Sequence, residues 1–268
     1  MPQGQQEPRE RHEQRRARRA AGALRTAVLW AALREHALDR AACLGRPLRV
    51  LDLGGGTGEL AVPLAELGAQ VTGRLTVVDP SPDALAALAR RAAESQVSDR
   101  VVGIQGDADT LADLLPGQTH DLVCCHGVLE VVDDPAATLA ALAAALAPEG
   151  LLSLLVAGRL AAVVARTLAG EFAQASALLA SPDGRWGPGD PLPRRFDVAQ
   201  VQDLVAAAGL AVHSWHGVRL LSDLVPSAYL DTDADRAALL AVEEALAGHP
   251  AYDLGRLGAG LHLLARHP

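Results

Sequence analysis

The sequence predicts an α/β protein built on a mostly parallel sheet. Three observations lead to this prediction: short apolar segments alternate with alanine-rich segments from Arg49 onward, a glycine-rich turn follows the first apolar segment, and an aspartate ends the second. Short apolar strands separated by helical segments are typical of parallel sheets that are covered on both faces. The 268 residues are enough for one large domain and scarcely enough for two.

The expected elements follow in order along the chain. A flanking helix is expected over residues 22–38, where Ala27, Leu29, Trp30 and Leu33 have helical spacing. Strands are expected at residues 49–53, 75–79, 101–105, 122–125, 151–156, 210–218 and 260–265. Helices are expected at residues 59–67, 83–93, 108–114, 135–146 and 197–208, and Pro148-Glu149-Gly150 is expected to stop the fourth. Seven strands that close with an antiparallel C-terminal pair, with helices on both faces, describe a Rossmann-like sheet.

Two segments are expected to lie outside this alternation. Residues 1–20 are expected to be a flexible, arginine-rich arm, and residues 21–268 a single domain. The arm is either a solvated lead-in to the first helix or an RNA contact, and the lack of interleaved aromatic residues favours the first. Residues 158–195 are expected to form an insertion that is helical first and rich in Pro and Gly later. Loops of this length inside a domain are often functional, so we expect a lid, with a disordered loop as the alternative.

Charge and composition exclude several kinds of partner. The formal net charge of −8 argues against non-specific binding to a polyanion such as DNA. The apolar stretch over residues 136–169 is interrupted by charged residues and Pro148, and is too short to span a membrane. Cys43, Cys124 and Cys125 lack metal-ligand spacing, so no metal site is expected. Buried thiols fit a reducing compartment, which predicts a cytoplasmic protein.

The glycine-rich turn predicts a cofactor site. Gly54, Gly55 and Gly56 join the first strand to the next helix, and such a turn lets a ligand lie directly on the backbone. The dinucleotide-binding pattern requires a further glycine where this chain has Glu59, whose charge would repel a pyrophosphate. S-adenosyl-L-methionine carries a sulfonium cation and tolerates acidic neighbours such as Asp52. The turn therefore predicts a methyl-donor site.

Two further aspartates extend this predicted site. Asp79 ends the second strand, where a carboxylate can accept hydrogen bonds from both ribose hydroxyls. Asp107 follows the third strand and precedes Ala108, whose small side chain would admit an adenine ring. Asp107 can accept a hydrogen bond from the adenine amino group or can simply cap the helix that follows. The sequence leaves both roles open for Asp107.

With the run Asp121-Leu-Val-Cys-Cys-His-Gly-Val-Leu-Glu130, the chain resembles the class I S-adenosylmethionine-dependent methyltransferases. Within that class it is similar to the bacterial tRNA 5-carboxymethoxyuridine methyltransferases, through residues 22–30, 126–130, 217–219 and 254–256. The resemblance implies that the methyl donor is contacted by Arg25, Gly54, Gly55, Asp79, Ala108 and His126. It also makes Arg219 and Arg256 the candidates for holding an acceptor carboxylate, a group suited to bidentate contact with arginine.

The acceptor is left open between two classes. The resemblance implies a carboxylate of a modified wobble uridine in tRNA. Ala157 and Gly158, however, stand where that family has an aromatic and an amide residue, and aromatic residues make up only 3 % of the chain. Base recognition in RNA usually relies on stacking, so these departures favour methylation of a small molecule at oxygen, nitrogen or carbon. A third possibility is a non-catalytic module that only binds the methyl donor.

Overall fold

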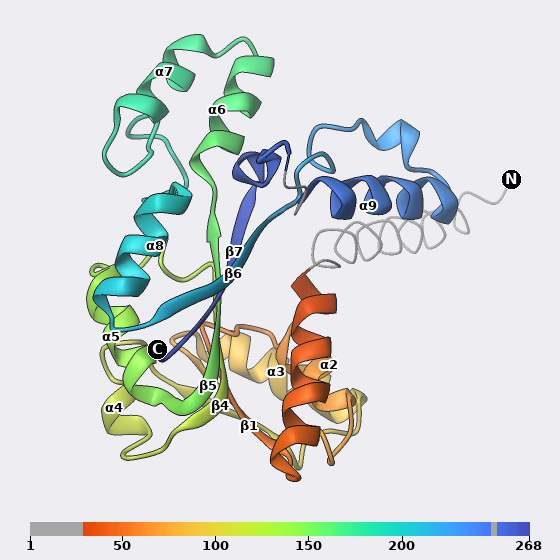
Figure 1. The fold of residues 1–268 in the computed structure, drawn as a ribbon, viewed down its shortest axis with the longest axis vertical. Coiled ribbons are helices and arrows are strands. Elements are labelled where there is room, and N and C mark those ends of the chain that lie inside the picture. The colour runs from red at the N-terminus through yellow and green to blue at the C-terminus, as the bar shows by residue number, and fades with distance from the viewer. Residues whose placement is uncertain (1–28, 248–250) are drawn as a thin grey trace, which may run out of the picture.

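The computed structural model describes residues 29–247 and 251–268, which form a seven-stranded sheet (Figure 1). The strand order is β3-β2-β1-β4-β5-β7-β6. The first five strands of this order are parallel, and β7 is antiparallel to both of its neighbours. The strands are β1 (Leu48–Leu53), β2 (Thr72–Asp79), β3 (Val101–Gln105), β4 (His120–His126), β5 (Leu146–Ala157), β6 (Ala211–Val218) and β7 (Gly260–Arg266). The predicted fold class, including the antiparallel C-terminal strand pair, is confirmed.

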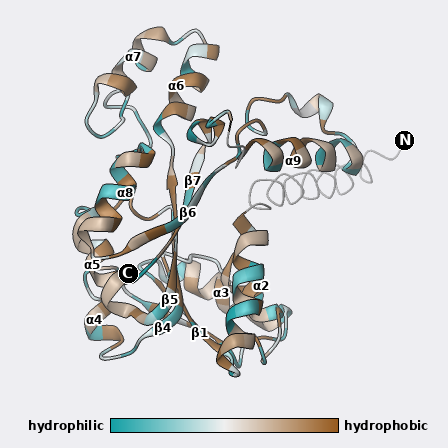
Figure 2. Cartoon of the chain, viewed as in Figure 1, coloured by the Kyte–Doolittle hydropathy of each residue, from teal (hydrophilic) through white to brown (hydrophobic). Residues whose placement is uncertain are grey.

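Helices cover both faces of the sheet, because the central strands are apolar on both sides (Figure 2). In β1, Leu48 and Val50 point to one hydrophobic cluster, while Leu51 and Leu53 point to another. The first cluster contains residues of a helix over 29–44, α2 (Ala61–Glu66) and α3 (Pro82–Glu94). The second contains residues of α4 (Leu111–Leu114), α5 (Pro135–Ala145) and α8 (Val198–Ala207).

Polar side chains determine where some of these helices begin. Ser81 Oγ accepts a hydrogen bond from Ala84 N at the start of α3, and Pro82 occupies the first turn. Asp134 Oδ1 accepts from Ala136 N and Ala137 N at the start of α5. These caps explain why α3 and α5 begin close to their predicted positions.

The structure corrects several predicted boundaries. The fourth predicted helix ends at Ala145, and the next strand begins at Leu146 instead of residue 151. The Pro148-Glu149-Gly150 segment, predicted to stop the helix, lies inside β5. The pairing of β5 with β4 shifts register there, so the segment forms a bulge in the strand. The predicted helix from Ala108 is wrong in its first turn, because α4 spans only Leu111–Leu114. Residues 108–110 form a turn, across which the side chains of Asp107 and Thr110 each accept a hydrogen bond from the backbone N–H of the other.

Residues 158–195 form a helical hairpin, α6 (Arg159–Leu168) and α7 (Phe172–Ala180), followed by an irregular segment (Figure 1). Its two ends meet at the sheet, because Arg159 N donates to Phe196 O and Phe196 N donates to Ala157 O, both at 2.9 Å. Arg159 also donates to the backbone oxygens of Ser181 and Pro182 at 2.9 and 2.8 Å. The insertion is thus fastened at its base, and movement as a lid remains a prediction.

The C-terminal part contains three elements that were not predicted: α9 (Asp233–Ala247) and the short 3-10 helices η2 (Ser227–Tyr229) and η3 (Leu254–Leu257). The arginine-rich arm at residues 1–20 and the candidate donor contact Arg25 lie outside the described residues. Among the helices that the structure does describe, none is both long and apolar enough to cross a bilayer.

An ion-pair cluster joins β1 and β4 at their amino ends. Arg46 donates to both carboxylate oxygens of Asp121, at 2.8 and 2.9 Å, and Arg49 N donates to Asp121 Oδ2 at 2.8 Å. Burial by itself raises the pKa of Asp121, but these hydrogen bonds and the arginine charges outweigh it and lower the pKa to about 2. Asp121 therefore stabilises the folded state as a carboxylate.

We expect Asp121→Asn to lower the free energy of unfolding by about 1.5–3 kcal/mol at pH 7, as is usual for hydrogen bonds to a charged group. Because the folded pKa lies below the unfolded value, the difference from the wild type should be full above about pH 4 and shrink as the pH falls toward 2. Urea denaturation at several pH values measures this. Asp99→Asn, at an exposed and weakly paired aspartate, is the control. A difference that did not change with pH would contradict the assignment.

Candidate functional site

The glycine turn after β1 has no room for side chains at two positions. A Cβ on Gly54, whose φ is +70°, would lie 2.3 Å from Val128 Cγ2. A Cβ on Gly55 would lie 2.4 Å from Asp52 Oδ2. Only glycine fits at both positions, so the backbone of the turn packs directly against Val128 and Asp52 at the carboxyl edge of the sheet, the edge at which α/β sheets bind ligands.

Asp79 fixes this turn to the end of β2. Its Oδ2 accepts a hydrogen bond from Gly56 N and its Oδ1 accepts from Ser81 N, both at 2.9 Å. Each carboxylate oxygen can accept more than one hydrogen bond, so these contacts orient the group and leave acceptor positions for ligand hydroxyls. The structure thus brings Asp79 and the glycine turn together, as the sequence predicted.

Asp52 lies beneath the turn as a buried carboxyl group. It is 2 % exposed, and its Oδ2 has no hydrogen-bond partner among the described residues. Burial, and secondarily the charge of Asp79, raise its pKa to about 7. A buried oxygen without a partner fits a site whose ligand brings N–H groups or positive charge.

The structure gives Asp107 a capping contact. Its exposed carboxylate accepts hydrogen bonds from Thr110 N at 3.0 Å and from Thr110 Oγ1 at 2.8 Å. These bonds lower the pKa of Asp107, the side-chain bond most strongly. Its neighbour Ala108 is buried against the cluster that contains α4 and α5. Contact of Asp107 or Ala108 with adenine stays a prediction.

His126 ends β4 beside the glycine turn. Leu53 of β1 pairs with Cys125, so the next residues along, Gly54 and His126, face each other across the two strands. His126 Nε2 lies 2.8 Å from Ser153 Oγ in a hydrogen bond. Burial lowers the pKa of His126 to about 4, which makes the ring neutral near pH 7. A neutral ring is compatible with a cationic ligand at its side.

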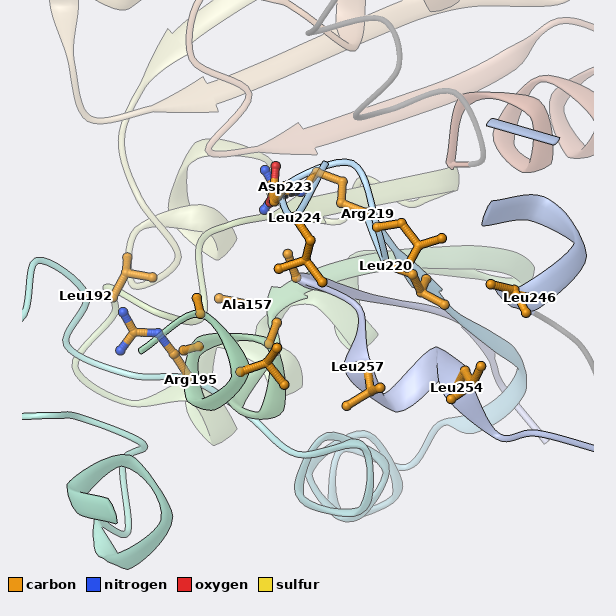
Figure 3. Close-up of a pocket in the computed structure, with 17 residues that line it drawn as sticks. Ala157, Leu192, Arg195, Arg219, Leu220, Asp223, Leu224, Leu246, Leu254 and Leu257 are labelled. Carbon is orange, nitrogen blue, oxygen red and sulfur yellow. Dashed lines mark ion pairs between the residues drawn. The ribbon is translucent and has the colours of Figure 1, made fainter. Parts of the chain in front are cut away.

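A cavity of about 310 Å³ opens at the same edge of the sheet (Figure 3). Its walls come from the end of β5, helix α6, the segment after β6, α9 and η3. Leucines dominate the lining: Leu192, Leu220, Leu221, Leu224, Leu246, Leu254 and Leu257. The charged residues in it are Arg195, Arg219 and Asp223. Since β5 is two strands from β1, the cavity starts roughly 10 Å from the glycine turn.

Two buried glutamates hold the cavity walls. Glu243 of α9 is 2 % exposed, and its Oε1 accepts from Leu221 N, Ser222 N and Ser222 Oγ at 2.7, 2.6 and 2.7 Å. Glu130 Oε1 accepts from Ala157 N at 2.5 Å, joining the loop after β4 to the end of β5. Neither role was predicted from the sequence. A local signal for Glu243 was its position in an apolar segment beginning with Asp233 and Asp235, but its partners lie about twenty residues earlier in the chain.

The structure separates the two arginines that the sequence proposed for the acceptor. Arg219 lines the cavity beside Asp223, with Nε 3.6 Å from Asp223 Oδ2 (Figure 3). Arg256 is 48 % exposed, pairs with Asp253 at 2.6 Å and lies over the Trp215 ring at 5.7 Å. Arg256 is not among the described residues that line the cavity. Arg195 lines it but is engaged with buried Asp190 at 2.7 Å.

A glycine turn without side chains, an aspartate at the end of β2 and a terminal antiparallel strand pair are features of a methyltransferase sheet, and the chain belongs to the S-adenosylmethionine-dependent methyltransferases. Residues 14–214 match the family described as "Methyltransferase domain". The chain is 34 % identical over 250 residues to the tRNA 5-carboxymethoxyuridine methyltransferase of Escherichia coli K12, covering 92 % of this chain and 89 % of that protein.

Solved structures agree on the fold. The CcbJ methyltransferase from Streptomyces caelestis superimposes with a TM-score of 0.55 at 17 % identity, covering 91 % of this chain and 89 % of that one. The [4+2]-cyclase SpnF superimposes with a TM-score of 0.53 at 21 % identity, covering 83 % of this chain and 76 % of that one. At such low identity these likenesses show the fold alone.

The methyl donor of this enzyme is S-adenosylmethionine, which when bound supplies a methyl group activated by a sulfonium. The described residues fit it: the turn carries no side chain at Gly54 and Gly55, Asp79 is oriented by two N–H groups, and His126 is neutral beside the turn. Contacts of the individual residues with the donor remain predictions.

We expect Gly54→Ala to weaken binding of S-adenosylhomocysteine at least tenfold, because the new Cβ collides with Val128 and the backbone is left-handed. Isothermal titration measures the dissociation constant. Gly45→Ala is a matched control: its φ is +61°, but a Cβ there meets nothing within 4 Å. Equal losses of affinity in both variants would show that general strain, and not the donor site, is responsible.

Proposed function

We propose that this methyltransferase esterifies the carboxylate of a modified wobble uridine in tRNA. The observation that supports this proposal is the similarity to the E. coli enzyme of that name, which extends over nine-tenths of both chains. The aligned length is too great to be confined to the donor-binding half of the fold. We also propose that the reaction takes place in the cytoplasm, where tRNA is found and where the buried thiols of Cys124 and Cys125 stay reduced.

For methyl transfer to a carboxylate, the main task of the protein is to position the two reactants. A carboxylate is ionised near neutral pH, so it needs no general base before it attacks the methyl carbon. The enzyme must align the attacking oxygen with that carbon and exclude water. The leucine walls of the cavity exclude water, and the Arg219 guanidinium can pair with the acceptor carboxylate, in exchange for its contact with Asp223.

One observation favours a second candidate, methylation of a small molecule. The described residues that line the cavity are mainly leucine and alanine and include no aromatic side chain on which a base could stack. A volume of about 310 Å³ is at the lower end of the range for small-ligand pockets. An apolar metabolite with one carboxylate or hydroxyl would suit this lining.

The test compares tRNA that carries 5-carboxymethoxyuridine with tRNA from cells that lack the modification. We expect methyl ester in the digested nucleosides of the first sample only, detected by mass spectrometry and removed by mild alkali. The enzyme must first bind S-adenosylhomocysteine by titration. Failure to form the ester with such a preparation would refute the tRNA proposal, and labelled products in a metabolite extract would then support the second candidate.

We expect Arg219→Gln to raise the KM for the acceptor at least tenfold and to leave the dissociation constant of S-adenosylhomocysteine within about twofold, because Arg219 lines the cavity and not the glycine turn. Steady-state kinetics and titration give the two values. Arg256→Gln, outside the lining, should change the acceptor KM less. The reverse order of the two effects would place the acceptor near Trp215 instead of in the cavity.

A further inference from the structure

A chain of buried polar side chains runs across four strands from the donor site. His126 Nε2 lies 2.8 Å from Ser153 Oγ, and Ser153 Oγ lies 2.8 Å from His262 Nε2. His262 Nδ1 in turn lies 3.0 Å from His216 Nε2. The four residues belong to β4, β5, β7 and β6, which are neighbours in that order. Strand pairing places them on one face of the sheet. Leu155 pairs with His126 and with His262, and His262 pairs with His216. Ser153 is two residues before Leu155 on β5 and so lies on the same face.

Burial makes this chain costly unless every link is a hydrogen bond. Ser153 and His262 are completely buried, and His126 and His216 are partly buried. Burial lowers the pKa of all three histidines, so each ring is neutral and carries one N–H. A neutral imidazole donates through one nitrogen and accepts through the other, and the serine hydroxyl donates only once.

Ser153 Oγ could accept from both rings, but its own proton would then have no acceptor, because its hydrogen-bond partners among the described residues are only these two histidines. With that proton used inside the chain, two arrangements remain. In one, His126 Nε2 donates to Ser153, Ser153 donates to His262 Nε2, and His262 Nδ1 donates to His216 Nε2. In the other, each bond is reversed, so that Ser153 donates to His126 Nε2 and the proton of His126 is on Nδ1. The direction of the whole chain therefore decides whether His126 Nδ1, beside the glycine turn, is a donor or an acceptor.

We propose that Ser153, His262 and His216 are positioning residues that hold the His126 ring in one orientation and one tautomer at the methyl-donor site. The proposal rests on the donor site and is independent of the acceptor's identity. In the described part of the chain, His126 Nδ1 has no hydrogen bond, so it is the atom of the ring left for a ligand. A ring fixed in advance loses less entropy on binding and presents a single kind of hydrogen bond.

The test is nuclear magnetic resonance of the full chain with ¹⁵N-labelled histidine, in which His126→Gln identifies the His126 signals among the nine histidines. Long-range ¹H–¹⁵N spectra distinguish the two neutral tautomers. In the wild type we expect one tautomer of His126. Ser153→Ala should produce a mixture of both and weaken S-adenosylhomocysteine binding three- to tenfold, the range expected for one hydrogen bond.

Two variants control for loss of packing. Ser153→Thr keeps the hydroxyl and should restore the single tautomer. Thr72→Val removes another buried hydroxyl, that of Thr72 on β2, which donates to Leu64 O of α2 at 2.9 Å. This variant should leave the tautomer of His126 and the affinity for S-adenosylhomocysteine unchanged. If Ser153→Ala does not fold, His216→Phe breaks the chain at its partly exposed end and should produce the same mixture. A mixture in the wild type, or an unchanged tautomer and affinity in a folded chain-breaking variant, would overturn the proposal.

Discussion

The contact of Val128 and Asp52 with the bare backbone of Gly54 and Gly55 is the constraint on which the rest of the site depends. It requires two positions without side chains at the point where β1 ends, and it brings the strand ends of β1, β2 and β4 to one edge. Asp79 adds a second constraint, because its carboxylate accepts from the N–H groups of Gly56 and Ser81. The predicted donor site is therefore built from backbone geometry, and side chains orient that backbone.

The cavity that we propose for the acceptor is built from the other end of the sheet. Because β7 is antiparallel to its neighbours, its amino end and the carboxyl ends of β5 and β6 lie at the same edge. The insertion after β5, the segment after β6 and η3 before β7 consequently meet there and enclose the cavity with leucines. Two buried carboxylates, Glu130 and Glu243, fasten these segments through backbone N–H groups. The glycine turn and the cavity lie at the same edge of the sheet but are formed by different residues.

Local patterns were sufficient for the individual strands, the glycine turn and the position of Asp79 at the end of β2, because each of these is encoded in a short stretch of sequence. They were insufficient for the start of α4, where residues 108–110 form a turn and the helix begins only at Leu111. The cavity could not be predicted, since Glu243 and Leu221 are brought together only by the packing of α9. The chain of hydrogen-bonded histidines could not be predicted from the sequence either, because Ser153 and His262 are 109 residues apart and become neighbours only through the β5–β7 pairing.

The fastening of the segment after β6 by a single α9 carboxylate has a consequence for how such enzymes diversify. Glu243 accepts hydrogen bonds from the backbone N–H groups of Leu221 and Ser222, and these bonds do not depend on which side chains the neighbouring positions carry. Substitutions at those leucines can reshape the cavity while the segment keeps its path and the glycine turn is untouched. One scaffold can in this way acquire new acceptors over evolutionary time without losing its affinity for the methyl donor.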